Sequence, residues 1–128
     1  MRLLLDTHIL IWALIEPARL SPDVAEMLQD VGNDVLFSAA SLWEISIKAA
    51  LGRADFGVAP EELLATAVSS GFVELPVQSR AALRVATLPH LHRDPFDRLL
   101  VAQAMTEPAV LITSDKHLAA YSELVRVM

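Results

Sequence analysis

The chain has 128 residues, of which 54% are hydrophobic, and a net charge of −6 from ten basic and sixteen acidic side chains. This length fits one domain, residues 1–128, with a core large enough to fold without disulfides. No apolar run approaches the roughly 18 residues of a membrane-spanning helix, and the acidic balance argues against a broad basic face for nucleic acid. The absence of cysteine excludes disulfides and thiolate metal sites and is compatible with a reducing cytoplasm, where we expect the protein to be found.

Apolar runs and turn residues predict strands and helices that alternate along the chain. Residues 2–6 predict a buried strand, and residues 7–15 predict a short helix that ends before Pro17. Next come a helix over 21–30 capped by Ser21, a strand over 34–38, a helix from about Ser41 to Gly52, a helix over 60–71, a strand over 72–76 and a helix over 78–88. The last elements are a helix over 94–107, a strand over 109–113, a short helix over 115–121 and a possible edge strand over 124–128.

This alternation predicts an α/β fold. Strands separated by helices form a parallel sheet with helices on both faces. We therefore expect a three-layer α/β/α sandwich with a central, mostly parallel sheet of four to five strands.

Four acidic residues fall at strand ends or near helix starts. Asp6 closes the first strand, and Asp115 comes just after the fourth. Glu44 lies in the helix that follows the second strand, and Asp97 lies early in its own helix. Because ligands of open parallel sheets bind beyond the carboxyl ends of the strands, we expect these acids to share one edge of the sheet.

Helix capping offers an alternative explanation for the same acids. Ser41 and Glu44 match the capping box S-x-x-E. In "DPFD", Asp94 suits the N-cap and Asp97 the third helical position, where negative charge favours the helix dipole. Asp115 is also able to cap the short helix that follows it. Any one such acid, taken alone, is more often a cap than a ligand.

Three features favour a cation site over caps alone. Asp6 lies behind the apolar "LLL", where an unpaired charge is costly, and Thr7 is able to cap in its place. Asp97 and Glu44 each share a helical face with apolar side chains, although Lys48 at i+4 from Glu44 also suits an ordinary surface pair. Acids held against apolar faces repel one another unless a cation joins them. Oxygen ligands without cysteine suit Mg²⁺ or Mn²⁺.

The segments "LLLDTHILIW", "SLWEISIK", "DRLLVAQA" and "LITSDKHL", in this order and at these separations, resemble the PIN-domain ribonucleases. The resemblance is greatest to the VapC toxins of bacterial toxin–antitoxin pairs, and it spans nearly the whole chain. It implies a catalytic and metal-binding set made of Asp6, Glu44, Asp97 and Asp115. It also implies that Thr113 supports this set, and we assign Asp94 to the cap.

The resemblance implies a metal-dependent endoribonuclease that hydrolyses RNA phosphodiester bonds as the toxin of a toxin–antitoxin pair. Its cofactor would be Mg²⁺ or Mn²⁺, and its protein partner a small antitoxin. The apolar excess, with "ILIWALI" near the N-terminus, favours a homodimer and a groove for a partner. Trp12 and Trp43, each among aliphatic residues, are interpreted as core or interface anchors. The basic side chains that are candidates to guide the RNA backbone are Lys48, Arg93, Arg98 and Lys116.

Other roles and functions remain open at this point. His90 and His92 have a spacing that suits a metal pair, but a polar loop is the favoured interpretation. His8 and His117 follow acidic residues by two positions, which places them at the rim of the site or on a solvated surface. A phosphatase of the haloacid dehalogenase type would need a second acid in "DTH". The alternative function is a non-catalytic α/β protein-binding module whose acids are helix caps.

Overall fold

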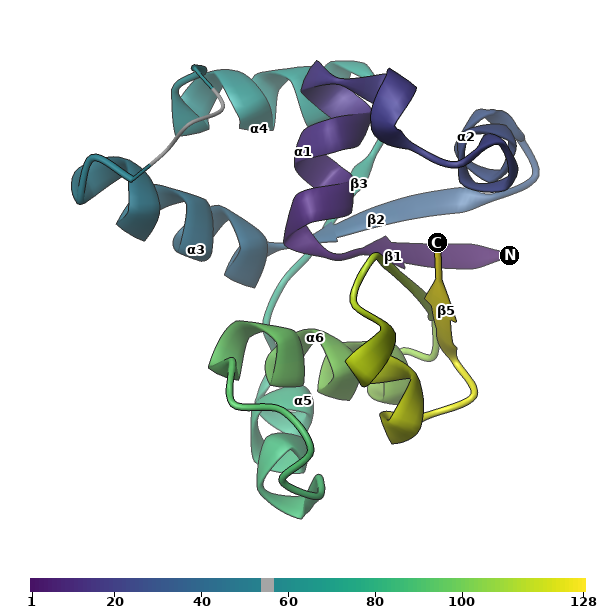
Figure 1. The fold of residues 1–128 in the computed structure, drawn as a ribbon, viewed down its shortest axis with the longest axis vertical. Coiled ribbons are helices and arrows are strands. Elements are labelled where there is room, and N and C mark those ends of the chain that lie inside the picture. The colour runs from purple at the N-terminus through teal and green to yellow at the C-terminus, as the bar shows by residue number, and fades with distance from the viewer. Residues whose placement is uncertain (54–56) are drawn as a thin grey trace.

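A five-stranded parallel sheet forms the centre of the computed structural model, which describes residues 1–53 and 57–128. The strands are β1 (Arg2–Leu5), β2 (Asp34–Ser38), β3 (Val73–Leu75), β4 (Val110–Thr113) and β5 (Val125–Val127). Their order is β3-β2-β1-β4-β5, and every neighbouring pair is parallel. The first strand of the chain therefore lies in the middle of the sheet, and the predicted strand over 124–128 lies at its edge (Figure 1).

Helices cover both faces of this sheet. They are α1 (Thr7–Ile15), η1 (Pro17–Arg19), α2 (Pro22–Gln29), α3 (Ala39–Ala50), α4 (Pro60–Ser69), α5 (Ser79–Arg84), η2 (Val85–Thr87), α6 (Pro95–Thr106) and η3 (Lys116–Tyr121). Figure 1 shows α1, α2 and α4 on one side of the sheet and α5 and α6 on the other. The predicted α/β/α sandwich is confirmed. Among the described residues, no helix is long and apolar enough to cross a membrane.

The core consists of two apolar clusters, one on each face of the sheet. Leu3 and Leu5 point to the face covered by α1, whereas Leu4 points to the face covered by α6. All three leucines are fully buried, because a central parallel strand is covered on both sides. This explains why the strand is continuously apolar and ends abruptly at an acid.

The structure differs from the sequence prediction at the start of α3. The helix begins at Ala39, and the hydroxyl of Ser38 caps it by accepting a hydrogen bond from the Ala40 N–H at 3.0 Å. Ser41 lies inside the helix, buried, and its hydroxyl accepts a hydrogen bond from Thr7 at 3.0 Å. The predicted capping box of Ser41 and Glu44 is therefore wrong. Ser38 and Ser41 are equally good caps by sequence, so the sequence alone did not show which of them begins the helix.

Candidate active site

Asp6 lies at the carboxyl end of the central strand, between β1 and α1. One of its carboxylate oxygens accepts a hydrogen bond from the Ile9 N–H at 2.9 Å, so Asp6 itself caps α1. The expectation that Thr7 takes over this role is wrong. The other oxygen accepts a hydrogen bond from the hydroxyl of Thr113, which ends the neighbouring strand β4. Burial raises the pKa of Asp6, and these hydrogen bonds offset that effect only in part.

Glu44 is buried on the inner side of α3, with only 5% of its surface exposed. The helical spacing suggested that Glu44 shares this buried face with Ile47 and Leu51. Those two residues are exposed instead. One carboxylate oxygen pairs with the Lys48 ammonium at 2.9 Å, which is the expected i+4 pair. The other oxygen, Oε1, is buried and has no hydrogen-bond partner among the described residues. A buried acceptor without a donor suits a cation ligand.

Asp97 lies in the first turn of α6, directly above its buried stripe. Leu100 and Val101 continue that stripe and are fully buried, as the spacing predicted. Asp94 caps the helix, and its Oδ1 accepts from the Phe96 N–H at 2.8 Å. Burial and the negative charges of Asp94, Asp6 and Glu44 raise the pKa of Asp97 to about 7. Three of the expected site acids are thus close enough to repel one another.

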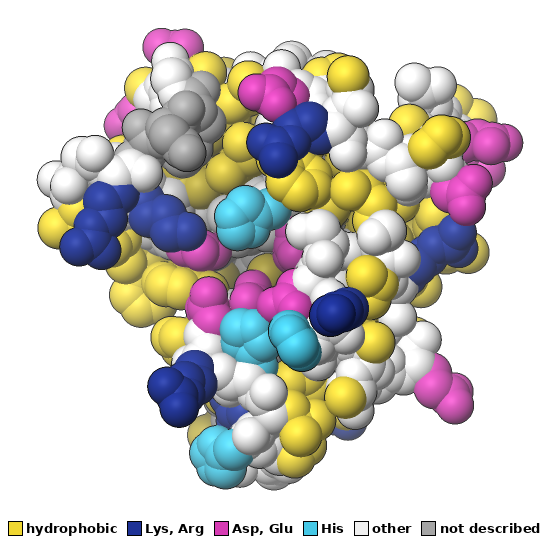
Figure 2. Space-filling view, in the orientation of Figure 1, with side chains coloured by type: hydrophobic (Ala, Val, Ile, Leu, Met, Phe, Trp, Pro, Cys, Tyr) yellow, Lys and Arg dark blue, Asp and Glu magenta, His cyan; other side chains and the backbone are white. Residues whose placement is uncertain are grey.

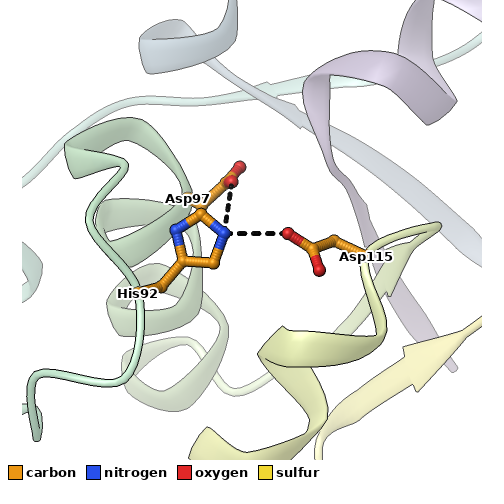
Figure 3. A group of neighbouring side chains, drawn as sticks. All are labelled: His92, Asp97 and Asp115. Atoms are coloured by element: carbon orange, nitrogen blue, oxygen red, sulfur yellow. Dashed lines mark hydrogen bonds and ion pairs between the residues drawn. The ribbon is translucent and has the colours of Figure 1, made fainter.

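Asp115 is joined to this group through Thr113 and His92 (Figure 3). Its backbone N–H donates to the Thr113 hydroxyl at 3.0 Å, and its Oδ1 caps η3 by accepting from the His117 N–H at 2.9 Å. Its Oδ2 lies 2.8 Å from Nε2 of His92. Burial alone would raise the pKa of Asp115, but the bonds from His117 and His92 outweigh it and lower the pKa.

His92 is a functional candidate that sequence reasoning considered but assigned to a polar loop. Its Nε2 lies 3.7 Å from Asp97 and 2.8 Å from Asp115. Within the described residues, these three side chains form a group whose ligand atoms all lie within 4.8 Å of one another. Asp6 and Glu44 lie beside the group rather than in it. The sequence signals for His92 were its spacing from His90, which is exposed, and its place two residues before the α6 cap.

The model of the PIN domain family matches residues 3–124. The chain belongs to the PIN-domain family. Comparison with curated proteins gave no match.

Solved structures share the fold of this PIN domain at low sequence identity. VapBC2 from Rickettsia felis, bound to a DNA fragment from its promoter, is 16% identical with a TM-score of 0.68, over 100% of this chain and 98% of the other. DNA-bound VapBC from Salmonella typhimurium is 18% identical with a TM-score of 0.70, over 100% and 97%. A domain of a functionally unknown protein from Methanocaldococcus jannaschii is 14% identical with a TM-score of 0.61, over 99% and 90%.

Some basic side chains of the PIN domain are exposed, whereas Arg98 is buried and forms hydrogen bonds inside the protein. Arg98 is 8% exposed, and its guanidinium donates to the carbonyl of Pro89 at 2.9 Å and to the hydroxyl of Tyr121 at 3.1 Å. The expectation that Arg98 contacts a phosphate is therefore wrong, because its donors are used inside the protein. Arg93 and Lys116 are exposed. Figure 2 shows acidic and histidine side chains around a hollow, with basic side chains at its margin.

Capping accounts for some acids of this PIN domain but not for all. Asp6, Asp94 and Asp115 each accept a hydrogen bond from a helix N-terminus. Glu44 and Asp97 lie inside their helices and cap neither. A set of caps alone gives no reason to bury these two carboxylates close to a third, since each additional negative charge raises the cost of ionising the others.

Proposed function

We propose that this PIN domain is a metal-dependent endoribonuclease, the toxin of a toxin–antitoxin pair, which hydrolyses RNA phosphodiester bonds. The observation that carries the proposal is the convergence of three acids: the charge of Glu44 raises the pKa of both Asp6 and Asp97, and its buried Oε1 has no hydrogen-bond partner among the described residues. A divalent cation relieves such repulsion, and carboxylate oxygens are the ligands that Mg²⁺ and Mn²⁺ prefer. The residues therefore fit the cofactor that the family resemblance implies.

Each residue of the site has a distinct part in this proposal. Asp6, Glu44, Asp97 and Asp115 are the ligands. Thr113 holds two of them, because it donates to Asp6 and accepts from the backbone of Asp115. A divalent cation bound there offsets the charge of a phosphodiester and lowers the pKa of a bound water. No side chain has to form a bond to phosphorus, so we expect no covalent intermediate.

Exposed basic side chains support an RNA-binding role at the margin of the site. Arg93 and Lys48 line one hollow together with Glu44, and Lys116 follows Asp115 directly. Phosphate contacts from a few lysine and arginine side chains weaken as salt rises, because each condensed counterion gains less entropy when it is released into a more concentrated solution. RNA as the substrate, rather than DNA, rests on the family resemblance.

A groove between α1 and α3 supports the antitoxin partner. It has a volume of about 910 Å³, and its apolar lining includes Ile11, Trp12, Ile15, Ile47 and Leu51. Its polar lining includes Thr7 and Ser114, the sequence neighbours of Asp6 and Asp115. A partner segment seated in the groove would therefore end beside the acids. The VapBC names of two structural neighbours are consistent with such a partner.

Cleavage of cellular RNA tests the proposed reaction. Protein freed of any partner is incubated with total RNA and Mg²⁺ or Mn²⁺, and the cut ends are mapped. Asp97→Asn should abolish the cuts and weaken Mn²⁺ binding in calorimetry. Asp23→Asn, the same change at an 80% exposed carboxylate on α2, should leave both unchanged. Identical cuts from wild type and Asp97→Asn would mean contamination, and unchanged Mn²⁺ binding would leave the protein-binding module as the better function.

A further inference from the structure

We propose that His92 is a positioning residue, which holds Asp115 in place through a ring tautomer that the backbone of Asp94 sets. This inference rests on the proposed function. The imidazole lies between two partners: its Nδ1 accepts a hydrogen bond from the Asp94 N–H at 3.0 Å, and its Nε2 lies 2.8 Å from Asp115 Oδ2. Figure 3 shows the ring placed between Asp115 and Asp97.

The contact with Asp94 decides which ring nitrogen carries the proton. A backbone N–H is only a donor, so Nδ1 must present its lone pair to it. The neutral ring then carries its proton on Nε2 and donates it to Asp115. The opposite tautomer would set two hydrogens against each other at Asp94 and two lone pairs against each other at Asp115. The two contacts therefore support the same tautomer.

The same contact argues against His92 as a metal ligand, although it belongs to the group with Asp97 and Asp115. Ligation by Nε2 requires a lone pair there and moves the ring proton to Nδ1, where the Asp94 N–H already points. Asp94 has little freedom to turn away. Its side chain caps α6 and accepts hydrogen bonds from the N–H groups of Phe96 and Asp97.

The loop that carries His92 is fastened to the elements that carry the acids. Arg98, next to Asp97, donates to the Pro89 carbonyl at 2.9 Å. The Leu91 N–H donates to the hydroxyl of Tyr121, at the end of η3, at 3.1 Å. Asp115 caps the start of η3. These contacts therefore hold both the donor on His92 and its acceptor on Asp115. This explains why the guanidinium of Arg98 is buried and donates through both of its terminal nitrogens.

The bond from His92 restricts the Asp115 carboxylate. Oδ1 already accepts from the His117 N–H, so donors to both oxygens fix the rotation of the group. Without His92, Asp115 keeps its cap but loses its second anchor beside Asp97. Loss of a partner that orients a metal ligand costs about 10–100-fold in metal affinity or activity.

Two substitutions separate the contacts of the ring. His92→Asn keeps an acceptor near the position of Nδ1 but has no donor that reaches Asp115. His92→Gln keeps a donor near the position of Nε2 and loses the acceptor for Asp94. We expect His92→Asn to weaken Mn²⁺ binding and RNA cleavage by about 10–100-fold, and His92→Gln to recover most of both. The melting temperature of each metal-free variant serves as the control for folding.

The outcomes separate this inference from the proposed function. If wild type binds no Mn²⁺, both fail. If wild type binds Mn²⁺ and His92→Asn binds it equally well, or if both variants lose binding together, only the role of His92 is overturned. Long-range ¹H–¹⁵N spectra of histidine-labelled protein give a direct readout: the proton should stay on Nε2 before and after addition of Mg²⁺. Loss of that proton with Mg²⁺ would identify a ligand instead.

Discussion

Asp97 links the charge of the site to the stability of the protein. Burial and neighbouring acids raise its pKa to about 7 in the folded state, whereas the unfolded chain has the ordinary value of 3.8. Between these two values the unfolded chain has released a proton that the folded protein still holds. The unfolded state therefore gains stability relative to the folded state as the pH rises from about 4 to about 7. Above pH 7 both states are ionised, and the full penalty of the buried charge is present.

Asp97→Asn should remove this pH-dependent penalty. Without metal, we expect the variant to match wild type near pH 4 and to melt roughly 2–8 °C higher above pH 7, the shift that about 1 kcal/mol produces in a domain of this size. This magnitude allows for solvent screening of a side chain that is 20% exposed. Scanning calorimetry in EDTA across this pH range measures the difference. A difference that stays constant with pH would contradict the assignment.

Sequence reasoning found the acids because their positions follow from the fold. Parallel strands end at one edge of the sheet, and Asp6 and Asp115 follow two such ends. His92 was assigned to a polar loop because its contact with Asp115 depends on the folded loop between α5 and α6, which brings it to an acid 23 residues away. Arg98 was misjudged for a related reason. Its spacing resembles that of a surface residue, but three backbone carbonyls of this loop draw it inward.

Helix α6 is fastened to the sheet by Gln103. This residue is 2% exposed, accepts a hydrogen bond from the Ser38 hydroxyl at 2.5 Å and donates to the Pro76 carbonyl at 3.3 Å. The contacts join α6 to the ends of β2 and β3. Asp97, two turns earlier on the same helix, therefore faces the sheet edge in a fixed orientation.

Gln103→Leu should weaken this attachment. The substitution keeps the side-chain volume but leaves Ser38 and Pro76 without their partner, and we expect a loss of about 1–3 kcal/mol of unfolding free energy. Thr106→Val is the matched control on the same helix, because the buried Thr106 hydroxyl has no hydrogen-bond partner. It should be neutral or stabilising. Urea denaturation of both variants gives the comparison, and equal losses would argue against a specific role for Gln103.

At the level of elements, predictions succeeded where local and tertiary signals agree. The strand over Asp34–Ser38 has the predicted bounds, because its three middle residues are buried and apolar, as a parallel strand covered on both faces requires. The predicted helix over 78–88 is instead split into α5 and η2, and the last short helix is a 3₁₀ helix. Apolar spacing over six or seven residues does not distinguish a 3₁₀ helix from an α-helix. The packing of these segments against α6 decides which of the two helices forms.

The exposed apolar surface of α3 is where we place the expected homodimer contact. Trp43 is 61% exposed, and its ring packs edge-on against Phe96 with 5.2 Å between the ring centroids. A large rigid aromatic side chain that stays exposed in one chain suits the centre of an interface. The residues of "ILIWALI" contribute less than expected, since Ile9 and Leu10 lie in the core.

Trp43→Arg should convert a dimer into a monomer without loss of Mn²⁺ affinity. Light scattering at micromolar concentration measures the mass, and calorimetry measures the metal. Leu83→Arg provides the control, because Leu83 is 74% exposed on α5 but lies away from this surface. The dimer should survive that change. Monomeric wild-type protein, or a dimer that survives Trp43→Arg, would reject this interface.

The central position of β1 has a consequence for the synthesis of the protein. Asp6 is translated well before the residue that binds it, because the hydroxyl that donates to its carboxylate belongs to Thr113, 107 residues later. β1 also pairs with β4, so the middle of the sheet stays open until β4 has emerged. The four acids thus come together only after Asp115 has been translated. If the chain is the proposed toxin, it would be inactive until that point, which leaves time for a partner made alongside it to be waiting when the site closes.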